Sequence, residues 1–219
     1  MENLNELFFD LDGTILDTSK RYYSIYYNII KELGGSPLTK KVYWNYKSNK
    51  VSEYEIAIRS HLPQSLFNEY NHTRINLIES DYYLKFDKVW PELFDFIPSS
   101  KIFNRILLIT LRQKRQQLIN QLDNLGISDW FENIITVEYN DNNPKRHLLK
   151  VDSILQLYTN NISGIFVGDT ETDMRAGKIL GLKTIAVTYG IRSAEHLTQE
   201  KPDIMLNSPK DLVNFIQTL

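Results

Sequence analysis

The chain has 219 residues, of which 42% are hydrophobic and 12% aromatic, so it carries enough apolar material for a folded core of native size. Its 25 Lys and Arg residues nearly balance 27 Asp and Glu residues, which argues against a nucleic-acid partner or an acidic membrane surface. The absence of cysteine excludes disulfides, thiolate metal sites and a cysteine nucleophile. We find no signal-peptide pattern and no apolar stretch approaching ~20 residues, so we expect a cytoplasmic protein.

The first predicted element is a buried strand that ends in two acids. Three apolar residues, 7–9, run directly into Asp10 and then Asp12, as in a strand that stops where it reaches solvent. Ligands of open α/β sheets bind beyond the carboxyl ends of the strands, so this loop is a candidate site. By itself it fits an Asp-Gly turn equally well. An EF-hand is excluded because its Gly and Glu positions hold Ile15 and Arg21.

An all-helical insertion is expected after this strand. Apolar residues recur at helical spacing over 18–33, and residues 37–83 show further helical patches without a convincing strand. We therefore expect a small helical domain, residues 17–87, inserted into a core domain formed by residues 1–16 and 88–219.

Strands and helices alternate through the rest of the chain. The predicted strands are residues 7–9, 105–110, 134–137, 164–167 and 183–187, with helical spacing between them. Such alternation implies βαβ units. The predicted fold class is α/β, with a doubly wound, Rossmann-like parallel sheet and a small all-helical domain.

Polar residues lie at or just beyond the ends of these strands. They are Asp10 with Asp12, then Thr110, then Lys145, then Asp169 with Asp173. Taken singly, a Thr can cap a helix, a loop Lys is usually solvated, and acids favour a helix N-terminus. Together they match phosphoryl transfer through an aspartyl phosphate, in which one carboxylate attacks phosphorus and another protonates the leaving oxygen. Oxygen ligands beside a phosphate indicate Mg²⁺ as the cofactor.

These motifs resemble those of the haloacid dehalogenase (HAD) superfamily of hydrolases, in particular the phosphatases related to phosphoglycolate phosphatase, pyrophosphatase and β-phosphoglucomutase. The matching motifs are Asp10-Leu11-Asp12-Gly13-Thr14, the strand ending in Thr110, a basic residue best matched by Lys145, and Gly168-Asp169-Thr170-Glu171-Thr172-Asp173. The similarity continues to Tyr189-Gly190, so it covers the whole core.

The resemblance implies a role for each acid. Asp10 would be the nucleophile that becomes phosphorylated, and Asp12 the general acid and then the general base. Mg²⁺ would be held by Asp10, by the main-chain oxygen of Asp12 and by Asp169, with Asp173 close by.

The resemblance also implies a set of phosphate-binding residues. Thr110 and Lys145 would bind the phosphoryl oxygens, and Lys145 would neutralise the nucleophile. Two motifs depart from the common pattern, because the third has Pro144-Lys145-Arg146 where Lys-Pro is common and the second differs after Thr110. Leu111 and Arg112 follow Thr110 where many relatives have Asn or Gly and then a base, and we expect Arg112 to reach the substrate. Lys150 is an alternative third-motif base, but we prefer Lys145 because it opens the predicted helix.

The helical insertion resembles the C1 cap of this superfamily, which closes over the core as a lid. The implied function is a Mg²⁺-dependent phosphatase acting on a small phosphorylated metabolite: a phosphoglycolate-like compound, a sugar phosphate, a nucleotide or pyrophosphate. The alternatives are a phosphomutase of the β-phosphoglucomutase type and a catalytically silent regulatory or binding protein. The sequence leaves the substrate and the oligomeric state open.

Overall fold

The structure is a computed structural model that describes residues 6–94, 103–137, 145–158 and 162–219. It divides into two compact units. The first, formed by Met1–Asp17 and Val89–Leu219, is called the α/β unit here. The second, Thr18–Lys88, is called the helical unit. Two short strands, β2 (Leu16–Asp17) and β3 (Lys88–Val89), form a separate two-stranded sheet.

The α/β unit is built on a six-stranded sheet of order β5-β4-β1-β6-β7-β8, with every pair parallel. The strands are β1 (Glu6–Phe9), β4 (Arg105–Thr110), β5 (Asn133–Thr136), β6 (Gly164–Gly168), β7 (Lys183–Val187) and β8 (Ile204–Leu206). Successive strands run outward from β1 on one side and from β6 on the other, so the strand order reverses between these two neighbours. The predicted α/β fold class is confirmed.

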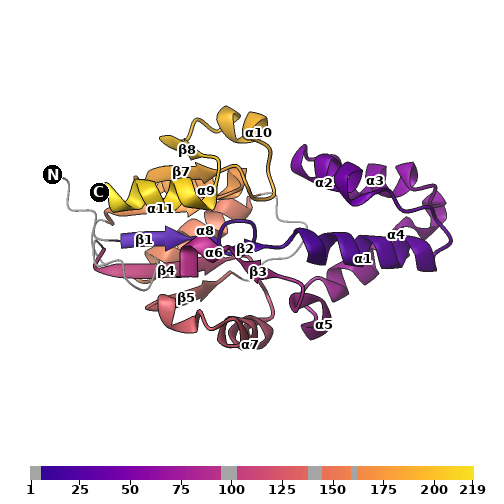
Figure 1. The fold of residues 1–219 in the computed structure, drawn as a ribbon, viewed down its shortest axis with the longest axis horizontal. Coiled ribbons are helices and arrows are strands. Elements are labelled where there is room, and N and C mark those ends of the chain that lie inside the picture. Colours follow the sequence, from indigo (N-terminus) through magenta and orange to yellow (C-terminus); the bar gives the residue numbers. More distant parts are fainter. Residues whose placement is uncertain (1–5, 95–102, 138–144, 159–161) are drawn as a thin grey trace. The chain divides into compact units, whose positions relative to one another are not determined.

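Helices cover both faces of this sheet because its central strands are apolar on both faces. Leu7 and Phe9 of β1 belong to the core on one face, whereas Phe8 belongs to the core on the other. The first core includes residues of α6 (Pro91–Phe94), α7 (Arg115–Leu125) and α11 (Pro209–Gln217). The second includes residues of α8 (Arg146–Leu155) and α9 (Glu171–Ile179) (Figure 1).

The last part of the α/β unit was not predicted. Strand β8 has three residues, too few for a periodic pattern, and it is followed by α11; α10 (Ala194–Gln199) precedes it. A side chain fixes this edge strand, because the Asp203 carboxylate accepts hydrogen bonds from the Thr184 backbone N–H and hydroxyl, both at 2.7 Å. The position of β8 therefore depends on a contact with β7 that lies 19 residues away in sequence.

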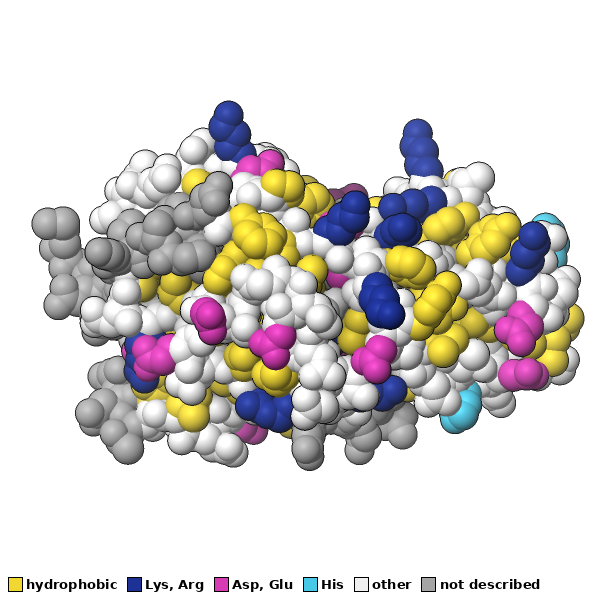
Figure 2. All heavy atoms as spheres, turned by 60° about the horizontal axis from the view of Figure 1, so that its bottom comes forward, with side chains coloured by type: hydrophobic (Ala, Val, Ile, Leu, Met, Phe, Trp, Pro, Cys, Tyr) yellow, Lys and Arg dark blue, Asp and Glu magenta, His cyan; other side chains and the backbone are white. Residues whose placement is uncertain are grey.

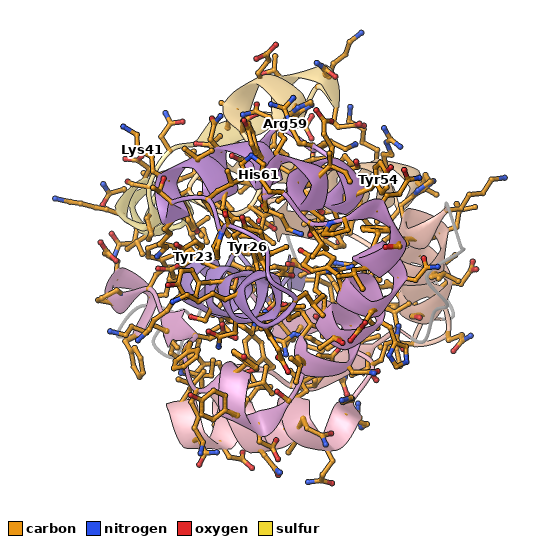
Figure 3. All side chains as sticks on the ribbon, turned by 90° about the vertical axis from the view of Figure 1, so that its right-hand side faces the viewer. Tyr23, Tyr26, Lys41, Tyr54, Arg59 and His61 are labelled. Atoms are coloured by element: carbon orange, nitrogen blue, oxygen red, sulfur yellow. The ribbon has the colours of Figure 1, made fainter. Side chains whose placement is uncertain are left out.

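The helical unit packs its helices around tyrosines as well as aliphatic residues. Its helices are α1 (Ser19–Glu32), α2 (Lys40–Ser48), α3 (Glu53–Arg59), the 3₁₀ helix Gln64–Leu66, α4 (Phe67–Leu77) and α5 (Asp81–Leu84). Tyr26 stacks on Tyr43 with ring centroids 4.3 Å apart, and its hydroxyl lies 2.6 Å from the Ser60 hydroxyl. Figure 3 shows Tyr23 beside Tyr26, and the Tyr23 hydroxyl donates to the Leu38 carbonyl at 3.1 Å. The hydroxyl groups of Tyr23 and Tyr26 thus find hydrogen-bond partners inside the unit.

Glu53 joins three helices of this unit. Its carboxylate pairs with Lys47 of α2, accepts a hydrogen bond from the Tyr70 hydroxyl of α4 at 2.9 Å, and lies 3.9 Å from Arg74 Nε. Burial alone raises the pKa of a carboxyl group, but the charges of Lys47 and Arg74 outweigh burial and lower the pKa of Glu53 to about 2.

Both charge signs are also mixed on the surface. On the face shown in Figure 2, acidic, basic and hydrophobic side chains are interspersed, as the near balance of charges suggests. Within the described residues, no helix is both long enough and apolar enough to cross a bilayer.

The low pKa of Glu53 predicts a loss of stability in acid. The pKa of Glu53 falls from 4.5 to about 2 on folding. The contribution of Glu53 to the free energy of unfolding is therefore complete above pH 4.5 and is lost as the pH falls toward 2. In urea unfolding followed by circular dichroism, Glu53→Gln should have a lower free energy of unfolding than wild type at pH 6. The difference between the two proteins should be about 2 kcal/mol smaller at pH 3. Glu55→Gln, which removes an exposed i,i+4 pair, is the control and should change stability by under about 0.5 kcal/mol. An equal gap at both pH values would contradict the prediction.

Candidate active site

Acids from two central strands meet where the strand order reverses. Asp10 directly follows β1 and Asp169 directly follows β6, and these strands are hydrogen-bonded neighbours in parallel register. The Asp10 backbone N–H donates to the Val167 carbonyl at 3.0 Å, which continues the ladder as far as the acid. Thr110 ends the neighbouring strand β4 and is buried. Parallel pairing thus brings side chains far apart in sequence to one edge of the sheet.

A buried lysine connects two of these acids. Lys150 lies on the buried face of α8, and its ammonium group donates to Asp10 Oδ1 and to Asp173 Oδ1, both at 2.6 Å. A further hydrogen bond reaches the Ile109 carbonyl at 3.4 Å. Three acceptors therefore use the three donors of this ammonium group inside the core.

The structure does not place Lys145 in this cluster. Lys145 is exposed at the N-cap of α8, five residues before Lys150. Five residues correspond to about 7.5 Å along a helix and to a different helix face, so the two lysines cannot exchange places by side-chain rotation. Lys145 was expected from the sequence because it starts the predicted helix. The sequence signal for Lys150 is its place on the same helix stripe as Val151 and Ile154, where a charged residue needs a buried partner.

Asp169 is held by a tight backbone cradle. Its Oδ2 accepts a hydrogen bond from the Ile191 backbone N–H at 2.5 Å, and its Oδ1 lies 3.5 Å from the Thr14 hydroxyl. A Cβ added at Gly13 or at Gly190 would come closer than 3.0 Å to this side chain. Gly13 also has a φ of +91°, which disfavours any side chain. Glycine at both positions thus lets two loops close on the carboxylate.

Asp173 is fixed at the start of α9. Its Oδ2 accepts hydrogen bonds from the Thr170 backbone N–H at 3.0 Å and from the Thr170 hydroxyl at 2.6 Å. Thr170 and Asp173 form a capping box, which satisfies the helix N-terminus while the other carboxylate oxygen faces Lys150. One residue therefore caps a helix and positions the lysine.

The cluster carries more negative charge than one lysine can offset. Oxygens of Asp10, Asp169 and Asp173 all lie within 4.8 Å of one another, and all three residues are buried. Burial raises the pKa of Asp10 to about 7, with Lys150 opposing this and Asp173 adding to it. Burial and the charges of Asp10 and Asp173 raise the pKa of Asp169 well above its usual value.

The pKa of Lys150 is raised as well, but by the neighbouring charges and against the effect of burial. Burial alone lowers the pKa of a lysine, but Asp10 and Asp173 outweigh burial and raise the pKa of Lys150. The oxygen-only donor set and the excess negative charge of the three acids fit a hard divalent cation.

Asp12 and Arg112 form a second charged pair at this edge. Arg112 Nε donates to Asp12 Oδ2 at 2.8 Å, and Arg112 Nη2 donates to Asp12 Oδ1 at 2.7 Å. Gln121 of α7 is also buried, and its Oε1 accepts from Arg112 Nη2 at 3.4 Å. Sequence reasoning named both charged residues but gave no indication that they pair or that Gln121 supports them.

The buried acids and the lysine at the strand ends of this parallel sheet form a candidate active site. The chain belongs to the haloacid dehalogenase-like hydrolase family, which it matches over residues 7–187. The resemblance found in the sequence and the expectation of a hydrolase are therefore confirmed.

Similar proteins match over nearly their full length. Pyrophosphatase PpaX of Bacillus pumilus is 23% identical over 97% of this chain and 96% of its own. Phosphoglycolate phosphatase of Aquifex aeolicus is 26% identical over 96% of this chain and 95% of its own. The solved structure of a haloacid dehalogenase-like hydrolase from Streptococcus pneumoniae superposes with a TM-score of 0.78 at 20% identity, covering 98% of this chain and 99% of its own.

The cradle around Asp169 predicts unequal effects of two glycine substitutions. Gly13 and Gly181 both have positive φ, +91° and +70°, but an added Cβ clashes at Gly13 and has open space at Gly181. Gly13→Ala should therefore lower the free energy of unfolding by about 2 kcal/mol more than Gly181→Ala. Both variants strain the backbone, but only the methyl group at position 13 clashes with the Asp169 side chain. Urea unfolding of the two variants measures the difference. Equal losses of stability in the two variants would show that the Asp169 side chain moves aside for the added methyl group at no cost in free energy.

Proposed function

We propose that the protein is a Mg²⁺-dependent phosphatase that transfers the phosphoryl group of a small phosphorylated metabolite to Asp10 and then to water. The observation that carries this proposal is the contact of Lys150 with Asp10 in a site with two further buried acids. A carboxylate held beside a cation at a strand end is suited to attack phosphorus, because the cation attracts the phosphoryl oxygens that would otherwise repel it.

The proposed reaction has two steps. In the first, Asp10 forms a bond to phosphorus, the bond to the leaving oxygen breaks, and Asp12 gives that oxygen a proton. In the second, Asp12 takes a proton from water, water attacks phosphorus, and the bond to Asp10 breaks. Asp12 thus ends each cycle as it began.

The remaining residues hold the phosphoryl group. Thr110 supplies a hydroxyl from the end of β4, and Lys150 supplies the ammonium group in place of the expected Lys145. Mg²⁺ would be held by Asp10, by the Asp12 main-chain oxygen and by Asp169, with Asp173 nearby, and would offset the charge of the phosphoryl oxygens. The donor chemistry of the acid cluster supports this assignment.

The similar proteins suggest which substrates to test first. One is named a pyrophosphatase and another a phosphoglycolate phosphatase, and both align with this chain over nearly its whole length. Pyrophosphate and phosphoglycolate therefore head the substrate panel, followed by sugar phosphates and nucleotides.

The nucleophile is tested by Asp10→Asn. We expect wild-type phosphate release to require Mg²⁺, to stop with EDTA and to fall at least about 1,000-fold in the variant, because an amide is a poor nucleophile. Asp152→Asn, an exposed acid on α8, is the control. Release that survived in Asp10→Asn would refute the assignment. Transfer of the phosphoryl group to an added sugar in preference to water would favour the phosphomutase alternative.

The two lysines are tested against each other. Lys150→Met should lower kcat/KM at least about 100-fold, because it removes the charge beside the nucleophile, whereas Lys145→Met should stay within about threefold of wild type. Steady-state kinetics with thermal unfolding of both variants gives the comparison. A large loss in Lys145→Met would return the role to the residue first expected from the sequence.

A further inference from the structure

In the Arg112–Asp12 pair, the carboxylate is more exposed to solvent than the guanidinium. The side chain of Arg112 is 4% exposed and that of Asp12 is 18% exposed. Both carboxylate oxygens are engaged in a bidentate pair, which combines charge with a fixed geometry. While this pair is formed, each Asp12 oxygen accepts a hydrogen bond from Arg112. Neither oxygen can therefore face a leaving group without losing such a bond.

The guanidinium is anchored by the α/β unit itself. Gln121 accepts from the same Arg112 nitrogen that contacts Asp12, and the Arg112 backbone N–H lies 3.4 Å from the Thr110 hydroxyl oxygen. These two contacts would hold the guanidinium in place if the Asp12 side chain rotated away from the pair. The result is a preformed fork for another oxyanion.

Two cations of the site serve different carboxylates. Lys150 contacts Asp10 and Asp173, so its charge lies beside the nucleophile and the phosphoryl group that would bind there. Arg112 contacts Asp12, the proposed acid for the leaving oxygen. The guanidinium therefore lies on the leaving-group side of the site.

We propose that Arg112 binds a second anionic group on the leaving group, and that this group replaces Asp12 in the guanidinium fork. Asp12, which is a carboxylate while it pairs with Arg112, is thereby released, takes up a proton from water and can give that proton to the leaving oxygen. This inference rests on the proposed function, since it uses Asp12 as the acid. The substrate class is a phosphate compound whose leaving group carries a carboxylate or a second phosphate near the scissile bond, because both present paired oxygens to a guanidinium. A leaving group without charge lacks the group that displaces Asp12.

Matched substrates test this selectivity. The first pair is phosphoglycolate and its neutral amide, and the second is pyrophosphate and methyl phosphate. In Arg112→Gln, the ratio of kcat/KM for the charged over the neutral member should fall at least about tenfold in one or both pairs, and the pair affected identifies the anion. Intrinsic reactivity cancels because the ratio is compared between variants. Lys114→Gln, an exposed base in the same loop, is the control. Unchanged ratios in both pairs would overturn the inference.

Binding separates this inference from the proposed function. Calorimetry in the Asp10→Asn background should show that adding Arg112→Gln weakens the charged ligand at least about tenfold more than the neutral one. Arg112→Lys, which keeps the charge but not the fork, should lose part of this preference and also serves if the Gln variant does not fold. If wild type hydrolyses none of the substrates, the proposed function fails while the binding result still tests Arg112. If wild type hydrolyses the substrates but Arg112→Gln weakens the charged and the neutral ligand equally, the inference about Arg112 is overturned and the proposed function stands.

Discussion

The site depends on one interaction, the buried contact of Lys150 with Asp10 and Asp173. Three carboxylates within 4.8 Å repel one another, and burial removes the water that would screen them. The lysine offsets part of this charge and fixes two of the acids. The charge that remains is what makes the cluster suited to a metal ion and to chemistry on an anionic group.

The backbone around these acids has little freedom. Asp169 lies between loops that contain Gly13 and Gly190, and Asp173 caps the helix that follows it. Each acid is thus positioned by the same local structure that ends a strand or begins a helix. This coupling explains why the site is built on strand ends, where rigid elements stop within hydrogen-bonding distance of one another.

The two cations of the site contact different acids. Lys150 is buried with Asp10, the proposed nucleophile, whereas Arg112 pairs with Asp12 and is supported by Gln121 of α7. A single positive charge shared among all the acids would attract phosphate without orienting it. In the proposed mechanism, two charges at separate acids would distinguish the transferred group from the leaving group, as substrate selectivity requires.

The sequence by itself determined five of the six strands described in the parallel sheet, and the acids at their ends. The apolar run into Asp10 and the run into Thr110 each define a strand end, because side chains buried on both faces leave no polar position until the strand stops. The short strand β8 escaped prediction because its three residues are too few to show a periodic pattern. The tertiary structure decided which lysine joins the acids and which partner Asp12 takes. Sequence order favoured Lys145, but the phase of α8 against the sheet buries Lys150, and only packing sets that phase.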